Sequence, residues 1–224
     1  MKNYLIIFCI LLSCQNPTKE EFILQKGDLL FQDLDSSPLC DAIEIVTPGF
    51  KNGNFSHIGI VIETGDNSKK RNQKHVRILE AIPNKVKTTR LDSFINRSLD
   101  EEGNPKVIVG RLKNKYLYTI EDAIKFLKSK IGVKYDDYFL INNNAYYCSE
   151  LIYEAFINDS VFKLEPMTFL HPLTLDTIEI WKEYYSKLKM EIPEKKPGIN
   201  PGIMSISKNI DIIHKYGKPK NMED

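Results

Sequence analysis

One cysteine in the sequence lies where two tyrosines give way to an amphipathic segment. Residues 144–156 read "NAYYCSELIYEAF", and the apolar positions fall on one helical face at Cys148, Leu151, Ile152, Ala155 and Phe156. The pattern predicts a helix that begins at Cys148, with the sulfur beside free backbone N–H groups and the positive end of the helix dipole. Both favour the thiolate, which is the nucleophilic form. The alternative is a small buried hydrophobic side chain.

A cysteine nucleophile needs a base, and His57 is the best placed of the four histidines. It lies in "SHIGIVIET", residues 56–64, where isoleucines at every second position predict a β-strand. His57 then shares a face with Gly59, which would leave open space beside the ring. The other three histidines are predicted in or next to loops: His75, His171 and His214. The alternative for His57 is a structural or surface role.

A third group should orient the imidazole, and Glu80 is the candidate. It stands in "RILEAI" with isoleucines on its own face, where an unpaired carboxylate is costly. If segments 56–64 and 75–82 form an antiparallel hairpin, Glu80 pairs with Gly59 and lies diagonal to His57. A register slip of one residue would put the two on opposite faces. The alternative is an edge glutamate that faces solvent.

Two further side chains are candidates for substrate binding. Tyr135, in "GVKYDDYF", would line the cleft or hold a substrate carbonyl, and the alternative is a packed loop aromatic. Gln32 ends the first predicted strand and would donate to an oxyanion, and the alternative is a surface amide. The backbone N–H of Cys148 is the default oxyanion donor. No Cys and His spacing suggests zinc, and this chemistry requires no metal or organic cofactor.

The order of predicted elements gives the fold class. Strands are predicted at 27–34, 56–64, 75–82 and 106–112, and helices at 40–46, 119–132, 148–156 and 175–188. The second helix carries Ile120, Ile124, Leu127 and Ile131 on one face. The tail from residue 191 onward is rich in Pro, Gly and Lys and is predicted to be irregular and surface-lying. Strands followed by helices predict an α+β domain with a mostly antiparallel sheet packed against helices.

Composition limits the class of protein. The chain has 224 residues, 42% of them hydrophobic and 27% charged, which suits one globular domain with a real core. The net charge of +1 and the absence of a Lys/Arg stripe give no case for a nucleic-acid partner.

The N-terminus, "MKNYLIIFCILLSC", has a basic start and an apolar run that is too short to span a bilayer. It resembles a bacterial lipoprotein signal, which implies cleavage before Cys14 and lipid attachment at Cys14. We therefore expect a signal peptide at 1–13, a lipidated tether at 14–24 and the folded domain at 25–224. By the same resemblance Gln15 favours the outer membrane, facing the periplasm. The alternative is an ordinary signal peptide cut elsewhere.

Two cysteines remain in the expected mature domain, Cys40 and Cys148. They could pair in an oxidising envelope, but a catalytic Cys148 must stay free.

Several motifs appear together in a recognisable order: "GDLLFQ", "SHIGIVIE", "ILEAIPNKVKTTRLDSFI", "GVKYDDYF" and "YYCSELIYEAF". They resemble the YiiX/YebB-like family of permuted papain-like hydrolases, within the NlpC-type cysteine hydrolases. The resemblance covers residues 27–156 and extends to "PGINPGIMSISKN". It implies a circularly permuted papain-like fold, with Cys148 as nucleophile, His57 as base and Glu80 as the third polar residue.

The resemblance implies a cysteine hydrolase of the amidase or peptidase type that works through a thioester. Expected substrates are amide bonds in cell-wall peptide or N-acyl amides. One alternative is a lipid-acting acyltransferase or thioesterase of the lecithin:retinol acyltransferase-like branch. Another is a non-catalytic binding lipoprotein that keeps the fold.

Overall fold

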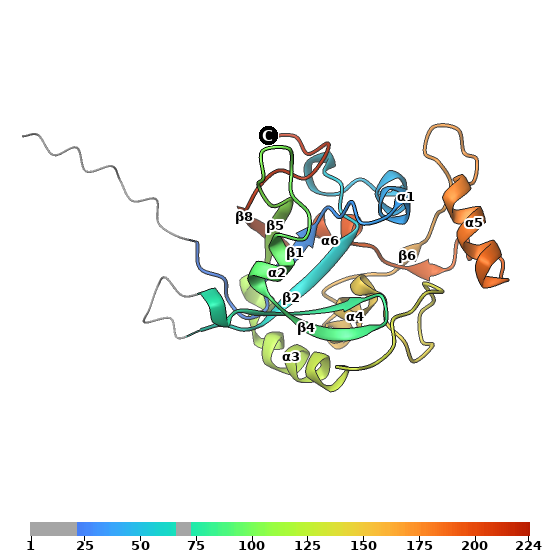
Figure 1. Ribbon diagram of the computed structural model, residues 1–224. Coiled ribbons are helices and arrows are strands. Elements are labelled where there is room, and N and C mark those ends of the chain that lie inside the picture. Colours follow the sequence, from blue (N-terminus) through green and yellow to red (C-terminus); the bar gives the residue numbers. More distant parts are fainter. Residues whose placement is uncertain (1–21, 66–72) are drawn as a thin grey trace, which may run out of the picture.

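An antiparallel sheet forms the centre of the structure, a computed structural model in which residues 22–65 and 73–224 are described (Figure 1). Its strand order is β4-β3-β2-β1-β5-β8. The bounds are β1 Leu29–Gln32, β2 His57–Glu63, β3 Arg77–Ile82, β4 Lys85–Arg90, β5 Val107–Leu112 and β8 Ile210–Lys215. A second, two-stranded sheet pairs β6 (Glu165–Pro166) with β7 (Pro197–Gly198).

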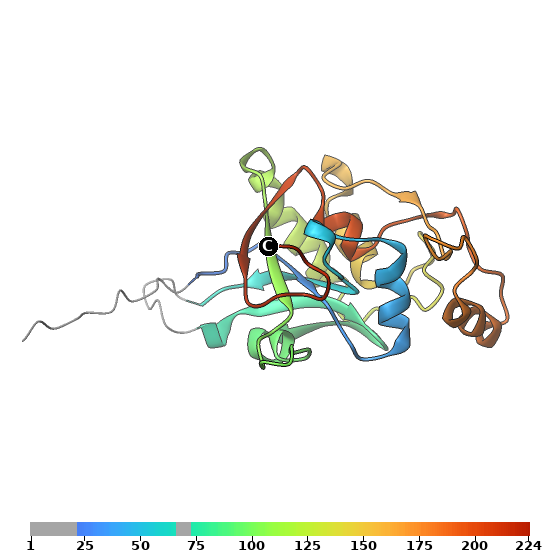
Figure 2. The same ribbon diagram turned by 90° about the horizontal axis from the view of Figure 1, so that it is seen from above.

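The helices lie around this sheet. They are α1 Pro38–Val46, α2 Leu91–Ile95, α3 Ile120–Ser129, α4 Cys148–Ala155, α5 Glu179–Leu188 and α6 Pro201–Ser205. Short 3₁₀ turns occupy Phe50–Asn52, Gln73–His75, Asn114–Thr119 and Ile157–Asp159. Helix α4 packs on β2 and β3 and also contacts α3 and α6. Helix α5 lies at one end of the molecule, away from the sheet, in both views (Figures 1 and 2).

Strand alternation divides the interior into two cores. Leu29 and Phe31 of β1 point into the larger core, which α3, α4 and α5 complete. Leu30, between them, points into the smaller core on the other face, which Phe94 of α2 covers. Burial of apolar side chains on both faces fixes the register of the sheet. The predicted α+β class, with an antiparallel sheet packed against helices, is confirmed.

Three sequence expectations differ from the structure. The tail is neither wholly irregular nor confined to the surface, because it contains α6 and β8 and buries Met204 and Met222. Helix α3 ends at Ser129, so Ile131 lies beyond it and is exposed. Leu24, the last residue of the expected tether, is 2% exposed and packs in the smaller core, so it lies within the folded domain.

The expected signal peptide, Cys14 and most of the expected tether lie outside the described residues. Among the residues that the structure describes, none of the helices has the length and apolar character needed to cross a membrane.

Candidate active site

The predicted start of the cysteine helix is confirmed, because Cys148 is the first residue of α4. Tyr147 before it is extended, with φ −86° and ψ 169°, so the chain turns into the helix at the cysteine. Leu151, Ile152 and Phe156 are buried in the larger core and hold the helix in place. The Cys148 side chain is 7% exposed and lies where the first backbone N–H groups of a helix lack intrahelical partners.

Glu150 lies in the first turn of the same helix and accepts a hydrogen bond from the Tyr147 N–H, at 3.3 Å. Burial raises its pKa to about 8, and the nearby charge of Asp136 adds to the rise against the opposing effect of the hydrogen bond. At neutral pH the carboxyl is therefore largely protonated. A neutral Glu150 does not repel an anionic sulfur at the start of α4.

The predicted contact between His57 and Glu80 is present. Strands β2 and β3 pair Ile60 with Leu79 and Val61 with Ile78, which is the register that places Glu80 opposite Gly59. The His57 Nε2 and a Glu80 carboxylate oxygen are 2.6 Å apart, and both side chains are buried. A polar pair inside an apolar strand face thus satisfies its own hydrogen-bonding needs.

The expectation of open space beside Gly59 is wrong. A Cβ atom at this position would lie 2.5 Å from Ile78 Cγ2 and 2.9 Å from Phe94 Cε2. The glycine instead allows these two side chains to close over the strand, and the His57 ring lies 5.7 Å from the Phe94 ring. His57 therefore contacts the smaller core through Phe94 and is hydrogen-bonded to Cys148.

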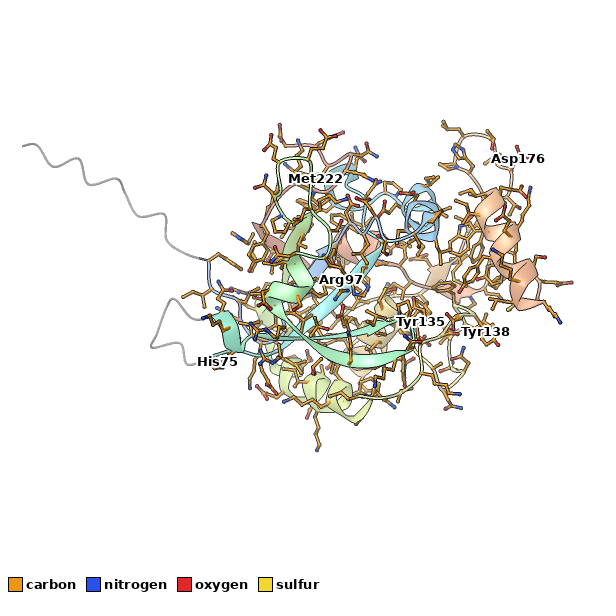
Figure 3. All side chains as sticks on the ribbon, viewed as in Figure 1. His75, Arg97, Tyr135, Tyr138, Asp176 and Met222 are labelled. Atoms are coloured by element: carbon orange, nitrogen blue, oxygen red, sulfur yellow. The ribbon has the colours of Figure 1, made fainter. Side chains whose placement is uncertain are left out.

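Glu80 has two further partners that the sequence did not reveal. Arg97, which follows α2 (Figure 3), donates to both carboxylate oxygens at 3.0 and 2.7 Å. The Thr89 hydroxyl on β4 donates to one of them. Burial alone would raise the pKa of Glu80, but the hydrogen bonds and charges of His57 and Arg97 hold it well below its usual range. Glu80 is therefore a carboxylate at neutral pH.

The protonation of His57 follows from its neighbours. Burial alone lowers its pKa, but hydrogen bonding to Cys148 and Glu80 and the negative charges of both partners outweigh burial and raise the pKa to about 9. Since Nε2 faces Glu80, the ring nitrogen left for the Cys148 sulfur is Nδ1. At neutral pH the site therefore favours an imidazolium beside the sulfur.

This shift predicts how stability depends on pH. The pKa of His57 is raised from 6.5 to about 9, so its contribution is fully present below about pH 6.5 and is lost as pH rises through 9. The excess stability of the wild type over His57→Gln should be larger at about pH 6 than at about pH 9.5. Urea unfolding of both proteins at both pH values measures it.

Comparing the two proteins at each pH removes the contributions of Glu44 and Glu150. Their pKa values are also raised, mainly by burial, to about 7 and about 8, and both proteins share them. An excess stability that stays constant or grows with pH would contradict the assigned protonation of His57.

A mostly apolar pocket opens at the cysteine. Its empty volume, including the part open to solvent, is about 700 Å³, and its wall contains both Cys148 and Tyr135. The apolar lining includes Ile43, Val46, Phe139, Phe169, Trp181 and Ile203. Burial, and then the charge of Cys148, raise the pKa of Tyr135 well above its usual value, so its hydroxyl remains a hydrogen-bond donor. Figure 3 shows Tyr135 in the segment that leads to α4.

Gln32 is not a surface amide. It lies directly opposite His57 in the pairing of β1 with β2, is fully buried, and is not part of the pocket wall. Its side-chain N–H donates to the Phe94 carbonyl at 2.8 Å, so this donor is engaged behind the histidine. Gln32 therefore holds Phe94 in place behind His57 and does not line the pocket in which a substrate would bind.

Cys40 and Cys148 are both free thiols, so the disulfide left open by the sequence is absent. Within residues 22–65 and 73–224, no three His, Cys, Asp or Glu side chains are grouped in a way that would hold a metal ion.

Comparisons with known proteins bear on the family and the fold. A family model described as permuted papain-like amidase enzyme, YaeF/YiiX, matches residues 23–214. The structure is similar to the crystal structure of the metalloprotein yiiX from Escherichia coli O157:H7, with a TM-score of 0.67 and 23% identity. That similarity covers 87% of this chain and 98% of the other, and at this identity it shows the fold alone. A search of curated proteins found no match.

Proposed function

Because the chain belongs to the family of permuted papain-like amidase enzymes, we propose that it is a cysteine amidase with Cys148, His57 and Glu80 as its catalytic triad. The observation that carries the proposal is the unbroken line of contacts from Glu80 through His57 to Cys148 at the start of a helix. A nucleophile, its base and an orienting group are the parts that covalent hydrolysis requires.

Acylation begins from the sulfur anion and the protonated ring of His57. The sulfur attacks the carbonyl carbon of the amide, and the carbonyl oxygen takes up the negative charge near the backbone N–H of Cys148. The C–N bond then breaks as the His57 ring gives its proton to the leaving nitrogen. An amine leaves, and the acyl group remains on Cys148 as a thioester.

Deacylation returns the enzyme to its first state. Water gives a proton to the neutral His57 ring and attacks the thioester carbonyl. The C–S bond breaks, the carboxylic acid leaves, and the sulfur anion again faces the imidazolium. Glu80 keeps the ring oriented through both steps because its hydrogen bond to Nε2 leaves Nδ1 for the reaction.

The pocket favours one of the expected substrate classes. Its isoleucine, phenylalanine and tryptophan lining suits an apolar acyl group better than the polar stem peptide of the cell wall. We therefore propose N-acyl amides with an apolar acyl part as substrates, with the Tyr135 hydroxyl donating to a substrate oxygen. The proposed location is the bacterial cell envelope, with a lipid anchor at Cys14 supported by the sequence alone.

The test is to incubate the purified protein separately with N-acyl amides, peptidoglycan fragments and phospholipids, and to identify products by mass spectrometry. Release of amine and fatty acid from the amides supports the proposal. Product from peptidoglycan alone would assign a cell-wall peptidase, and acyl transfer from phospholipid would assign an acyltransferase. No product from any class, together with reversible binding, would favour a binding lipoprotein.

A substitution in the pocket wall should change acyl-chain selectivity. Ile43→Trp adds bulk to the lining and should lower kcat/KM for a decanoyl amide on the order of tenfold more than for an acetyl amide. Ile45→Trp on the same helix is the control, because Ile45 is 40% exposed and does not line the pocket. Equal losses for the two chain lengths in Ile43→Trp would place the acyl group elsewhere.

A further inference from the structure

We propose that Arg97 is a positioning residue that orients Glu80 and offsets part of its charge, and thereby sets the pH range over which the Cys148 and His57 pair operates. The inference rests on the proposed function, since it takes these two residues as the reacting pair. The side chain of Arg97 is hydrogen-bonded to Glu80, and it acts on Cys148 and His57 only through that carboxylate.

Both carboxylate oxygens of Glu80 have two hydrogen-bonding partners each. One carboxylate oxygen accepts from Thr89 and from Arg97 Nη2, and the other accepts from Arg97 Nη1 and contacts His57 Nε2. The bidentate arrangement fixes the plane of the carboxylate, which in turn fixes the plane of the imidazole. Since Glu80 has no exposed surface, these four contacts replace its hydration.

Arg97 is itself held in place. Its guanidinium carbon lies 5.2 Å from the centre of the Phe94 ring, which is the ring that also packs against His57. The Phe94 carbonyl is fixed in turn by the Gln32 amide. The arginine side chain is 25% exposed, so one part of the guanidinium remains near solvent while the other faces the buried carboxylate.

The charges alternate along this line of contacts. With the proton on His57, the order is Arg97 positive, Glu80 negative, His57 positive and Cys148 negative. The positive charge of Arg97 lies on the same carboxylate as the imidazolium, and its repulsion offsets part of the attraction that Glu80 exerts on the His57 proton. A buried carboxylate with His57 as its only cation would hold the ring proton more tightly.

This offset matters for catalysis in both half-reactions. A more tightly held proton makes the imidazolium a weaker acid toward the leaving amine. Deacylation needs the neutral ring as a base, and a more tightly held proton means that the neutral form appears only at a higher pH. Arg97 therefore keeps the ring able to both give and take a proton near neutral pH.

The other side chains around Glu80 and His57 keep their charge when Arg97 is replaced. Thr89 and Gln32 are uncharged, and Tyr135 is held in its neutral form. Lys87 on β4 pairs with Glu80 across the sheet and is half-buried. Since Lys87 makes no hydrogen bond to Glu80 among the described contacts, it does not replace the bidentate arginine.

The test is the pH dependence of Cys148 alkylation by iodoacetamide, with the labelled Cys148 peptide quantified by mass spectrometry in the full chain. In a thiolate–imidazolium pair, the upper inflection of the rate reports loss of the His57 proton. Arg97→Gln removes the charge and should move this inflection up by roughly one pH unit. Arg97→Lys keeps the charge and should leave the inflection in place while lowering turnover through the lost bidentate contact.

Arg90→Gln is the matched control. Arg90 makes a similar two-point contact, but to the exposed Asp92, and should leave the inflection unchanged. An unmoved inflection in folded Arg97→Gln, or an equal shift in Arg97→Lys, would overturn the inference. Should Arg97→Gln not fold, Arg97→Met is the second neutral replacement, because it keeps an apolar stem over Phe94.

Alkylation needs no substrate, so the two proposals fail separately. A moved inflection in a protein without amidase activity contradicts the proposed function alone. An unmoved inflection in an active amidase contradicts the role of Arg97 alone.

Discussion

Cys148→Ala should reduce amide turnover by a factor on the order of 10³ or more. The proposed reaction passes through a bond between the substrate carbon and the Cys148 sulfur, and an alanine offers no atom that can form it. The start of α4, the pocket and the His57–Glu80 contact should persist, since the substitution removes one sulfur atom. Initial rates with a saturating N-acyl amide, together with thermal unfolding, measure both effects.

Cys40→Ala is the matched control for this prediction. Cys40 is the other free thiol among the described residues, is equally buried, and contacts only Ser36 and Ser37 by hydrogen bonds. It should retain turnover close to the wild type. If Cys148→Ala kept activity and Cys40→Ala lost it, the nucleophile would be wrongly assigned.

Glu80→Gln should lower both stability and turnover while preserving the size of the side chain. The free energy of unfolding should fall by about 3 kcal/mol, because the buried site then holds two cationic partners against an uncharged amide. Turnover should fall on the order of 10²-fold, since the protonated ring loses its counter-charge and its fixed orientation. Urea unfolding and steady-state kinetics measure the two quantities.

The stability loss should itself depend on pH. The pKa of Glu80 is lowered in the folded state from its usual 4.5, so its contribution is full above about pH 4.5 and is lost as pH falls below that value. The gap between wild type and Glu80→Gln should therefore narrow in acid. Glu63→Gln on β2 is the control, because its ion pair with Lys128 is exposed and should contribute less than about 1 kcal/mol. A gap that widens in acid would contradict the assigned charge of Glu80.

The sequence predicted the hairpin that carries the base because its signals are local. Alternating isoleucines define β2, and a polar loop separates it from β3, so simple folding back places Glu80 near His57. The sequence leaves a slip of one residue open, and the observed pairing of β2 with β3 excludes it. The helix start at Cys148 is also local, since the periodic apolar positions begin at that residue. These two features bring together the three residues of the proposed triad.

Arg97 and Thr89 escaped prediction because no local pattern marks them. Strand β4 reads "KVKTTR", in which only Val86 and Thr89 are buried, so the apolar alternation of a half-buried strand is missing. Arg97 reaches Glu80 from the end of a short helix, 17 residues away in sequence. Thr89 reaches Glu80 through the pairing of β4 with β3, and Arg97 reaches it because α2 packs on these two strands.

The surroundings of Gln32 and Gly59 and the structure of the tail were also predicted wrongly, because other segments of the chain pack against them. Gln32 is buried because Phe94 closes over the end of β1, and Gly59 is filled by Ile78 from the neighbouring strand. Strand β8 pairs with β5, about a hundred residues earlier in the chain, so a tail rich in Pro and Gly still forms a sheet edge.

Acid-quenched mass spectrometry of the reaction with the nitrophenyl ester of octanoic acid tests the Cys148 nucleophile most directly. The ester carries an apolar acyl group for the pocket and a leaving group that needs no proton. During the burst of nitrophenolate, we predict one added octanoyl group on the Cys148 peptide of the wild type and none in Cys148→Ala. An octanoyl group on Cys40, or a burst with no acylated Cys148 peptide, would contradict the account.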